Sequence, residues 1–437
     1  MYTPKYEGKN FVEVGTYGDG KKYRIPMPTQ PPKSEMRNFG KPKGQQFFER
    51  QEIPKFTNMR KKEIDLFIKR MWHLRKHGEW WLIKGEPVYL TGKAWTFLNF
   101  WHLRKGGLPE FRMTDMEWFW VWNYVERSPK CLGLFELKPR RIGETEKILF
   151  TLWEFASRVR KAHSGIMSKT DADAKTTYLV LARANSKMPF FFKPVNRGNN
   201  LPQAGLFFEY PEVRQPINAV VTNKAAELYS FPALESSVDF RATVLGAFDG
   251  EIIHRGYWDE VCKVAVRKVD IESQLGILKE CATENVGTRI VGKIILASTV
   301  EDMEEGKVNR DFKDNVRLAQ SIWDASDPDR INESTGMTDN GFFRYFRSYE
   351  NAARVDAWGF PMYEEVREQR RQTILNYERN EQWEQLARYK RKFPASEKEA
   401  LMPSVDDCDL HPAIIAKRIG QLALETGWAG SILDEFG

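Results

Sequence analysis

The first hundred residues change from an extended pattern to a helical one. Prolines and their neighbours exclude a helix between residues 24 and 34, so we predict an extended arm over residues 1–56. From residue 57 the apolar positions recur every three or four residues and basic residues occupy the other positions, which is typical of solvent-facing helices with one buried stripe. We therefore predict a helical region over residues 57–105.

Two aromatic segments also have helical spacing, residues 92–103 and 114–126. Thr114 and Glu117 have the spacing of a capping box, so we predict that the second helix begins at Thr114. The short run at residues 85–90 predicts a strand or a turn ahead of both helices.

From residue 131 short apolar runs alternate with helical segments. This alternation predicts an α/β fold with a mainly parallel sheet between layers of helices. In such sheets, ligands bind beyond the carboxyl ends of the strands. The predicted strands are residues 132–137, 165–168, 240–245, 252–258 and 290–297, and the predicted helices between them are residues 144–161 and 171–187.

The last hundred residues are helical and basic, above all over residues 364–392. We therefore divide the rest of the chain into an α/β core over residues 106–300, a helical lid over residues 301–395 and a loop-like C-terminal linker over residues 396–437.

The composition narrows the classes of function. The chain has 437 residues, of which 41% are hydrophobic, which suits a folded protein of two or three domains. No apolar run is long enough to span a bilayer and the N-terminus lacks a signal-peptide pattern, so we expect neither a membrane partner nor export. The four scattered cysteines favour reduced thiols over a zinc site. The formal charge of +7 permits a phosphate-rich partner without requiring one.

The first candidate site is the segment KPRRIGETEK, residues 138–147, between a predicted strand and a predicted helix. A strand, a glycine turn and a helix N-terminus can cradle phosphate, because open amides and the helix dipole face the anion. The usual Walker A motif is absent, since Glu144 stands where its lysine belongs. Lys138, Arg140 or Arg141 would have to supply the cation, while Thr145 keeps the hydroxyl that binds magnesium. A basic surface loop is an equally good interpretation of this segment alone.

Glu144 itself needs an explanation. A carboxylate beside a triphosphate is repelled, so we expect Glu144 to point away and to pair with one of the three loop cations or to stabilise the helix N-terminus. The substitution Glu144→Lys, which restores the usual motif, is then expected to be tolerated.

The second candidate site is IIHRGYWDE, residues 252–260, a predicted strand that ends in two carboxylates. In a Walker B motif, Asp259 would hold magnesium and Glu260 would deprotonate the attacking water. The Asp-Glu dipeptide is common and this strand is unusually polar, so the motif is weak alone. We expect Lys263 and Arg267, just downstream, to face solvent.

The third candidate site is the end of the predicted strand at residues 290–297, followed by Ser298 and Thr299. Hydroxyls at this edge can sense the γ-phosphate and transmit its loss, although an ordinary strand-end turn has the same residues. Each motif is weak evidence alone, but the three together are more specific, because they occur in the order of a P-loop ATPase and each follows a predicted strand.

The ordered set resembles the large terminase subunits of tailed phages, in particular those of crAss-like phages. The resemblance extends from about residue 89 to residue 401, and the segments that carry it are KPRRIGET, GAFDGEIIHRGYWDEVCK, GKIILASTVEDMEEG, YLTGKAWTFLNFW, KMPFFFKP and KFPASEKEAL. It implies an ASCE-type P-loop ATPase core with a helical lid. It also implies catalysis by Glu260, Arg140 and Arg141, nucleotide binding by Lys138, Gly143, Thr145, Ser298 and Thr299, and magnesium binding by Asp259 and Thr145.

The resemblance further implies ATP and Mg²⁺ as cofactors and double-stranded DNA as cargo. A homo-oligomeric ring would pump the DNA through the portal protein into the procapsid, assisted by the small terminase subunit. We expect this chain to act in the host cytoplasm at the portal, and not to be part of the mature virion. Such subunits usually continue into a nuclease domain. Here VDDCDL at residues 405–410 has acidic residues, but we see no distributed carboxylates after it of the kind that such a domain needs, so we expect the nuclease to be missing or encoded separately and no nuclease activity from this chain alone. The alternatives are a helicase-like, nucleic-acid-dependent ATPase and an inactive structural or adaptor protein of the same fold.

Overall fold

The structure is a computed structural model that describes residues 5–7, 10–15, 22–197, 201–209, 233–264, 269–284, 289–299 and 310–402. Its centre is a seven-stranded sheet in which β8 alone is antiparallel to its neighbour and lies at one edge. The α/β architecture predicted from the sequence is therefore confirmed. In spatial order the strands are β16 (Phe342–Phe346), β6 (Gly133–Leu137), β13 (Lys293–Ser298), β10 (Arg255–Asp259), β7 (His163–Ser168), β9 (Ser237–Ala242) and β8 (Leu206–Phe207).

The order of the central strands has a consequence for the candidate site. β13 lies between β6, which precedes the phosphate-loop candidate, and β10, which carries the Walker B candidate. The third candidate site, at the end of β13, therefore lies between the first two.

The two faces of the sheet contribute to two hydrophobic clusters. Leu134 and Ile295 pack on one face, and their neighbours Phe135 and Leu296 pack on the other, because side chains alternate along a strand. Helices cover both faces: α3 (Met113–Arg127), α4 (Glu144–Ala156) and α5 (Asp171–Lys187) lie on the first, and α7 (Ile271–Cys281) and α8 (Arg310–Ala325) on the second.

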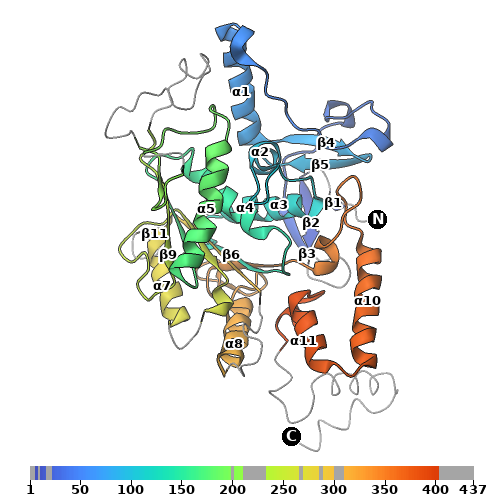
Figure 1. Ribbon diagram of the computed structural model, residues 1–437, viewed down its shortest axis with the longest axis vertical. Helices are drawn as coiled ribbons and strands as arrows, with labels where there is room; N and C mark the ends of the chain where they lie inside the picture. The colour runs from blue at the N-terminus through green and yellow to red at the C-terminus, as the bar shows by residue number, and fades with distance from the viewer. Residues whose placement is uncertain are drawn as a thin grey trace, which may run out of the picture.

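The N-terminal part packs against the same core (Figure 1). The predicted arm contains a three-stranded antiparallel sheet, and the predicted strand at residues 85–90 is half of a hairpin. The elements are β1 (Lys5–Glu7), β2 (Phe11–Gly15), β3 (Lys22–Pro26), η1 (Lys33–Glu35), η2 (Lys43–Gln45), η3 (Phe56–Asn58), α1 (Lys61–His77), β4 (Glu79–Ile83), β5 (Glu86–Leu90) and α2 (Gly92–Phe100).

The C-terminal part is mainly helical, and Figure 1 shows α10 and α11 as a packed pair. Arg370 of α10 pairs with Glu399 of α12 at 2.5 Å and with Glu350 of α9 at 3.6 Å, which ties α10 to both of these short helices. The elements are β11 (Thr283–Glu284), β12 (Arg289–Ile290), η5 (Val261–Lys263), β14 (Ile331–Asn332), β15 (Met337–Thr338), α9 (Tyr349–Ala352), α10 (Tyr363–Arg379), α11 (Trp383–Lys392) and α12 (Glu397–Ala400).

Several local predictions differ from the structure. α3 begins at Met113 with Arg112 as its N-cap, so Thr114 is not the cap. The predicted helix at residues 364–392 is two helices, because the chain turns at Glu381, whose φ is +52°. Strand β16 was not predicted; it falls inside the predicted lid, so the boundary at residue 300 leaves one strand of the sheet outside the predicted core. Within the described residues, no helix combines the length and the apolar character that a bilayer crossing needs.

Candidate functional site

The loop between β6 and α4 has an open helix N-terminus. Gly143 is the N-cap of α4 and has a φ of +80°, a left-handed conformation that glycine adopts without steric cost. Arg141 is also left-handed, with a φ of +63°, which is costly for a residue with a Cβ and is frequent at functional sites. Since glycine has no side chain to cap the helix, the first amides of α4 are available to an anion.

The three predicted motifs meet at one edge of the sheet. β13 pairs in parallel with both flanking strands, so that Asp259 lies opposite Ala297 and Ser298 lies opposite Leu137. Residues that follow these strands are therefore neighbours in space. Lys138 Nζ, directly after β6, is 3.6 Å from Glu260 Oε1, directly after β10.

Glu260 is held by cations and by hydrogen-bond donors on both of its oxygens. Oε1 faces Lys138, while Oε2 is 2.9 Å from Lys263 Nζ and accepts from the amide and the hydroxyl of Thr299, at 3.3 and 3.4 Å. Burial alone would raise the pKa of Glu260, but Lys138 and Lys263 outweigh it and lower the pKa to about 2. Glu260 is therefore an ionised carboxylate in a largely dry setting.

Asp259 lies in a different environment. Burial and the neighbouring Glu260 raise the pKa of Asp259, and Lys138 offsets them only in part. The hydroxyl of Tyr257 donates to Asp259 Oδ1 at 2.5 Å and also interacts with the side chain of Thr145. Asp259 and Thr145, the two predicted magnesium ligands, thus share one hydrogen-bonding partner. Carboxylate and hydroxyl oxygens are ligands that Mg²⁺ prefers. A carboxylate whose negative charge is not fully offset by its neighbours, such as Asp259, also attracts a cation.

Of the three loop cations, Lys138 is buried and lies at the carboxylates, whereas Arg140 and Arg141 are exposed. Burial alone would lower the pKa of Lys138, but Glu260 and Asp259 raise it above its ordinary value, so its ammonium stays charged. The amide of Arg140 donates to the carbonyl of Lys392 at 3.2 Å, which joins the loop to the end of α11.

Glu144 points away from the open loop, as the sequence predicted, but its partners differ from those expected. Its side chain is 1% exposed and pairs with Lys147 at 3.1 Å and with Arg347, which follows β16. Asp115 of α3 completes the group, at 2.6 Å from Lys147 and 3.3 Å from Arg347. Within the described residues Glu144 forms no ion pair with a loop cation, and its place in the first turn of α4 agrees with the other expectation, stabilisation of the helix N-terminus.

Ser298 and Thr299 have different surroundings. The Ser298 hydroxyl is buried, accepts from the amide of Cys262 at 3.1 Å and donates to the carbonyl of Thr299 at 3.2 Å. It therefore fixes the turn η5 that follows the Walker B candidate. Thr299, in contrast, contacts Glu260 directly.

Three further residues belong to the site although the sequence did not place them there: Lys263, Tyr257 and Arg347. The expectation that Lys263 faces solvent is wrong, since its side chain is 4% exposed. The rule that functional residues follow strands would have found Arg347, had β16 been recognised. Arg267 and residues 405–410 lie outside the described residues.

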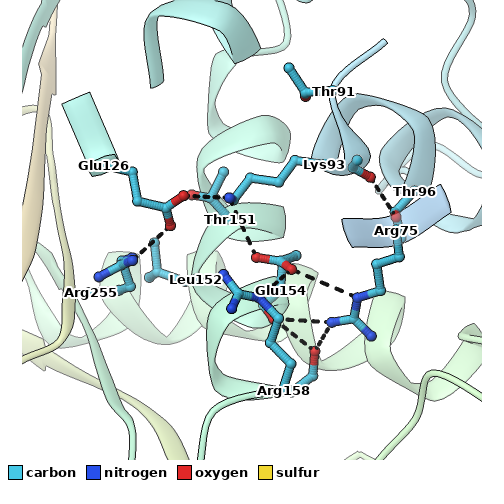
Figure 2. A network of polar contacts seen from close by, with 12 residues as sticks. Arg75, Thr91, Lys93, Thr96, Glu126, Thr151, Leu152, Glu154, Arg158 and Arg255 are labelled. Atoms are coloured by element: carbon cyan, nitrogen blue, oxygen red, sulfur yellow. Dashed lines mark hydrogen bonds and ion pairs between the residues drawn. The ribbon is translucent and has the colours of Figure 1, made fainter. Parts of the chain in front are cut away.

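A buried polar network connects the far ends of the same elements to the N-terminal part (Figure 2). Glu126 of α3 pairs with Lys93 of α2 at 2.5 Å and with Arg255 at 2.7 Å, at the start of β10. Glu154, near the end of α4, lies 3.8 Å from Arg75 of α1 and 3.9 Å from Lys93. The helix that begins at the phosphate-loop candidate and the strand that ends at Asp259 are thus anchored at their opposite ends by one network.

A second group of possible metal ligands lies toward the amino end of β7, where His163, Asp239 and Glu251 have ligand atoms within 4.8 Å of one another. The two ring nitrogens of His163 face the two carboxylates, at 2.8 and 3.3 Å. Arg241 pairs with both carboxylates as well. Because Arg241 contacts both carboxylates, the group has the features of a structural ion-pair cluster.

Among solved structures, the chain matches phage proteins. The ATPase domain of the Thermus phage P74-26 large terminase aligns with a TM-score of 0.35 and 13% sequence identity, over 66% of this chain and 99% of that one. The HK97 bacteriophage large terminase aligns with a TM-score of 0.37 and 10% identity, over 64% of this chain and 51% of that one.

This chain resembles phage large terminases. With identities and TM-scores this low, the similarity to the large terminases is one of general architecture. Neither a protein-family model nor a curated protein matches the sequence.

Proposed function

We propose that this chain is a terminase-type ATPase motor that hydrolyses ATP to move double-stranded DNA. The observation that supports this most strongly is the meeting of Lys138, Asp259 and Glu260 at the carboxyl edge of the mainly parallel sheet. A buried cation, two carboxylates and an open helix N-terminus are the groups that phosphoryl transfer to water requires.

Each group has a proposed role. Lys138 and the first amides of α4, after Gly143, bind the triphosphate. Asp259 and Thr145 hold Mg²⁺, which neutralises charge on the phosphates. Glu260 accepts the proton of the attacking water, and Thr299 reports the state of this carboxylate to the rest of the chain.

Arg140 or Arg141 is the proposed arginine finger, acting in cis on the charge that develops on the transferred phosphate. Their exposure at the loop suits groups that engage a ligand rather than the core. The rest of the proposal follows the resemblance: a homo-oligomeric ring at the portal, working with the small terminase subunit in the host cytoplasm.

The decisive experiment is steady-state ATP hydrolysis with and without double-stranded DNA. We expect DNA-stimulated turnover by the wild-type chain. Glu260→Gln should retain ATP binding and lose about 10²–10⁴-fold in kcat, the usual contribution of a general base. Asp259→Ala should also weaken magnesium-dependent ATP binding. The matched control is Glu272→Gln, an exposed glutamate in the first turn of α7.

Other results would favour the alternatives. Normal turnover by Glu260→Gln contradicts its role as the base. Unchanged hydrolysis after single alanine substitutions of Lys138, Arg140 and Arg141 means that this loop does not bind phosphate. A folded wild-type chain without ATP turnover favours an adaptor protein, and ATP-driven DNA movement that needs no portal favours a helicase-like enzyme.

A further inference from the structure

The two oxygens of Glu260 have unequal partners. Three donors approach Oε2, namely Lys263 Nζ at 2.9 Å and the amide and hydroxyl of Thr299 at 3.3 and 3.4 Å. Oε1 has Lys138 Nζ at 3.6 Å, the longer of the two ion-pair distances. Oε2 is thus held by residues that follow β10 and β13, whereas Oε1 faces the phosphate-loop candidate.

One partner of Oε2, Lys263, lies in the turn η5, which backbone hydrogen bonds hold in place, and the other, Thr299, follows β13. Glu260 has a φ of +55°, its amide donates to the carbonyl of Ala297 at 2.8 Å, and its carbonyl accepts from the amide of Lys263 at 2.8 Å. Ser298 Oγ accepts from the amide of Cys262 at 3.1 Å. Lys263 therefore keeps its place relative to Glu260 whatever the phosphate loop does.

The amide of Lys138 donates to the carbonyl of Ser298 at 3.2 Å, so its backbone is also held at the end of β13, but its side chain reaches Glu260 only through the 3.6 Å contact with Oε1. Lys138 lies on the loop that binds triphosphate under the proposed function, and phosphate oxygens offer it more negative charge than one carboxylate. Binding of triphosphate therefore draws Lys138 from Oε1, while Lys263 and Thr299 remain at Oε2.

We infer that Lys263 is a positioning residue for hydrolysis, which fixes Oε2 of Glu260 so that Oε1 becomes the oxygen that receives the proton from water. This inference rests on the proposed function. It assigns the two lysines to separate tasks: Lys138 to binding of nucleotide, and Lys263 to orientation of the base. A purely structural ion pair between Lys263 and Glu260 would stabilise the turn without affecting kcat.

The test is a comparison of kcat with KM and with the Kd for ATP in three variants. Lys263→Met should lower kcat about ten- to a hundredfold, the usual effect of removing a group that orients a functional side chain, and should leave the KM and Kd for ATP within about threefold. Lys263→Arg retains a cation beside Oε2 and should recover most of kcat. Lys138→Met should instead lose ATP binding.

Lys293→Met is the matched control for loss of a buried lysine. Lys293 lies at the amino end of β13, where its ammonium donates to the carbonyls of Ser128 and Cys131, remote from Glu260. Thermal unfolding of each variant reports its folded fraction, to which kcat is normalised. We expect Lys293→Met to show the wild-type kcat per folded molecule.

The outcomes separate the inference from the function on which it rests. If wild-type protein hydrolyses ATP and Lys263→Met keeps its kcat within twofold, or raises it, the positioning role is wrong and the proposed function stands. If Lys263→Met and Lys263→Arg lose kcat equally, or Lys293→Met loses it too, the effect is structural and the inference also fails. If folded wild-type protein does not hydrolyse ATP, both are wrong.

Discussion

Glu144 is a residue whose sequence context and structural context lead to opposite expectations. In the sequence it replaces a Walker A lysine, so Glu144→Lys looks like the repair of a motif. In the structure its carboxylate lies between Lys147 and Arg347, with a side chain 1% exposed. A lysine there would put a third cation beside these two, with Asp115 and the buried Glu136 as the remaining acidic groups around them.

We therefore predict that Glu144→Lys destabilises the protein by at least about 3–5 kcal/mol, the cost of breaking a buried ion pair. The measurement is the free energy of unfolding in urea. Glu272→Lys, at the exposed first turn of α7, is the control and should have little effect. Wild-type stability of Glu144→Lys would mean that Arg347 and Lys147 do not depend on this carboxylate.

Glu117 of α3 offers a pH test of the same region. Burial raises the pKa of Glu117 to about 8, although Arg347 opposes this, and its Oε1 is buried without a hydrogen bond. A carboxyl whose pKa is higher in the folded state stabilises that state below its unfolded pKa, and this contribution is lost as the pH rises through about 8.

Glu117→Gln keeps the shape and cannot ionise. We predict that the wild-type protein loses stability relative to this variant between pH 6 and pH 8.5, by on the order of 2 kcal/mol. Urea unfolding at both pH values measures the difference. A constant difference between the two proteins over this range would show that Glu117 is already ionised at pH 6.

At the scale of elements, the sequence located most of the parallel sheet, because apolar runs and amphipathic helices have strong local patterns. The predicted helix at residues 171–187 matches α5, whereas α4 ends at Ala156, five residues before its predicted end. β16, with the sequence FFRYF, is short and carries an arginine, and it becomes a strand through its pairing with β6, which no local pattern reveals.

The residues of the candidate site could be predicted from the sequence only where the strand that precedes them was recognised. Residues directly after recognisable strands, such as Lys138 and Glu260, could be grouped by the rule for parallel sheets. Arg347 and Tyr257 could not, since Arg347 depends on the unrecognised β16 and Tyr257 acts through its contact with Thr145. Long-range ion pairs leave no signal in a single sequence.

Glu126 joins three elements and allows a prediction at this scale. It pairs with Lys93 of α2 and with Arg255 of β10, and the side chains of all three are at most 10% exposed. Glu126→Gln removes the paired carboxylate of buried Arg255 and leaves Lys93 with Glu154 at 3.9 Å, so we predict a loss of about 3–5 kcal/mol in unfolding free energy. Glu284→Gln, in the exposed pair with Arg289, should lose about 1 kcal/mol or less. Equal losses for the two variants would contradict the role of the network.

At the scale of the whole molecule, the N-terminal helices and the sheet share one hydrophobic core. Phe97 of α2 packs on Phe150 of α4, with ring centroids 5.4 Å apart, and Trp101 packs on Trp153 at 5.9 Å. These contacts cross the boundary predicted at residue 105. The helical N-terminal region therefore covers a face of α4 that would otherwise be apolar and exposed.

We predict that a fragment beginning at residue 106 does not fold alone, because removal of residues 1–105 exposes the aromatic side chains on α3 and α4. Expression of this fragment and of the whole chain, followed by thermal unfolding, tests this. A cooperative transition in the fragment at a temperature close to that of the whole chain would show that the core is an independent domain.

The pair formed by Glu144 and Arg347 also has an evolutionary consequence. The two positions are 203 residues apart in the chain and share one buried contact. A descendant that acquires lysine at position 144 must first lose, or exchange, the arginine at position 347. Related sequences are therefore expected to fall into two groups, one with a carboxylate at the first position and arginine at the second, and one with lysine at the first and no cation at the second. The unusual phosphate loop would then persist because its reversal requires two coordinated changes.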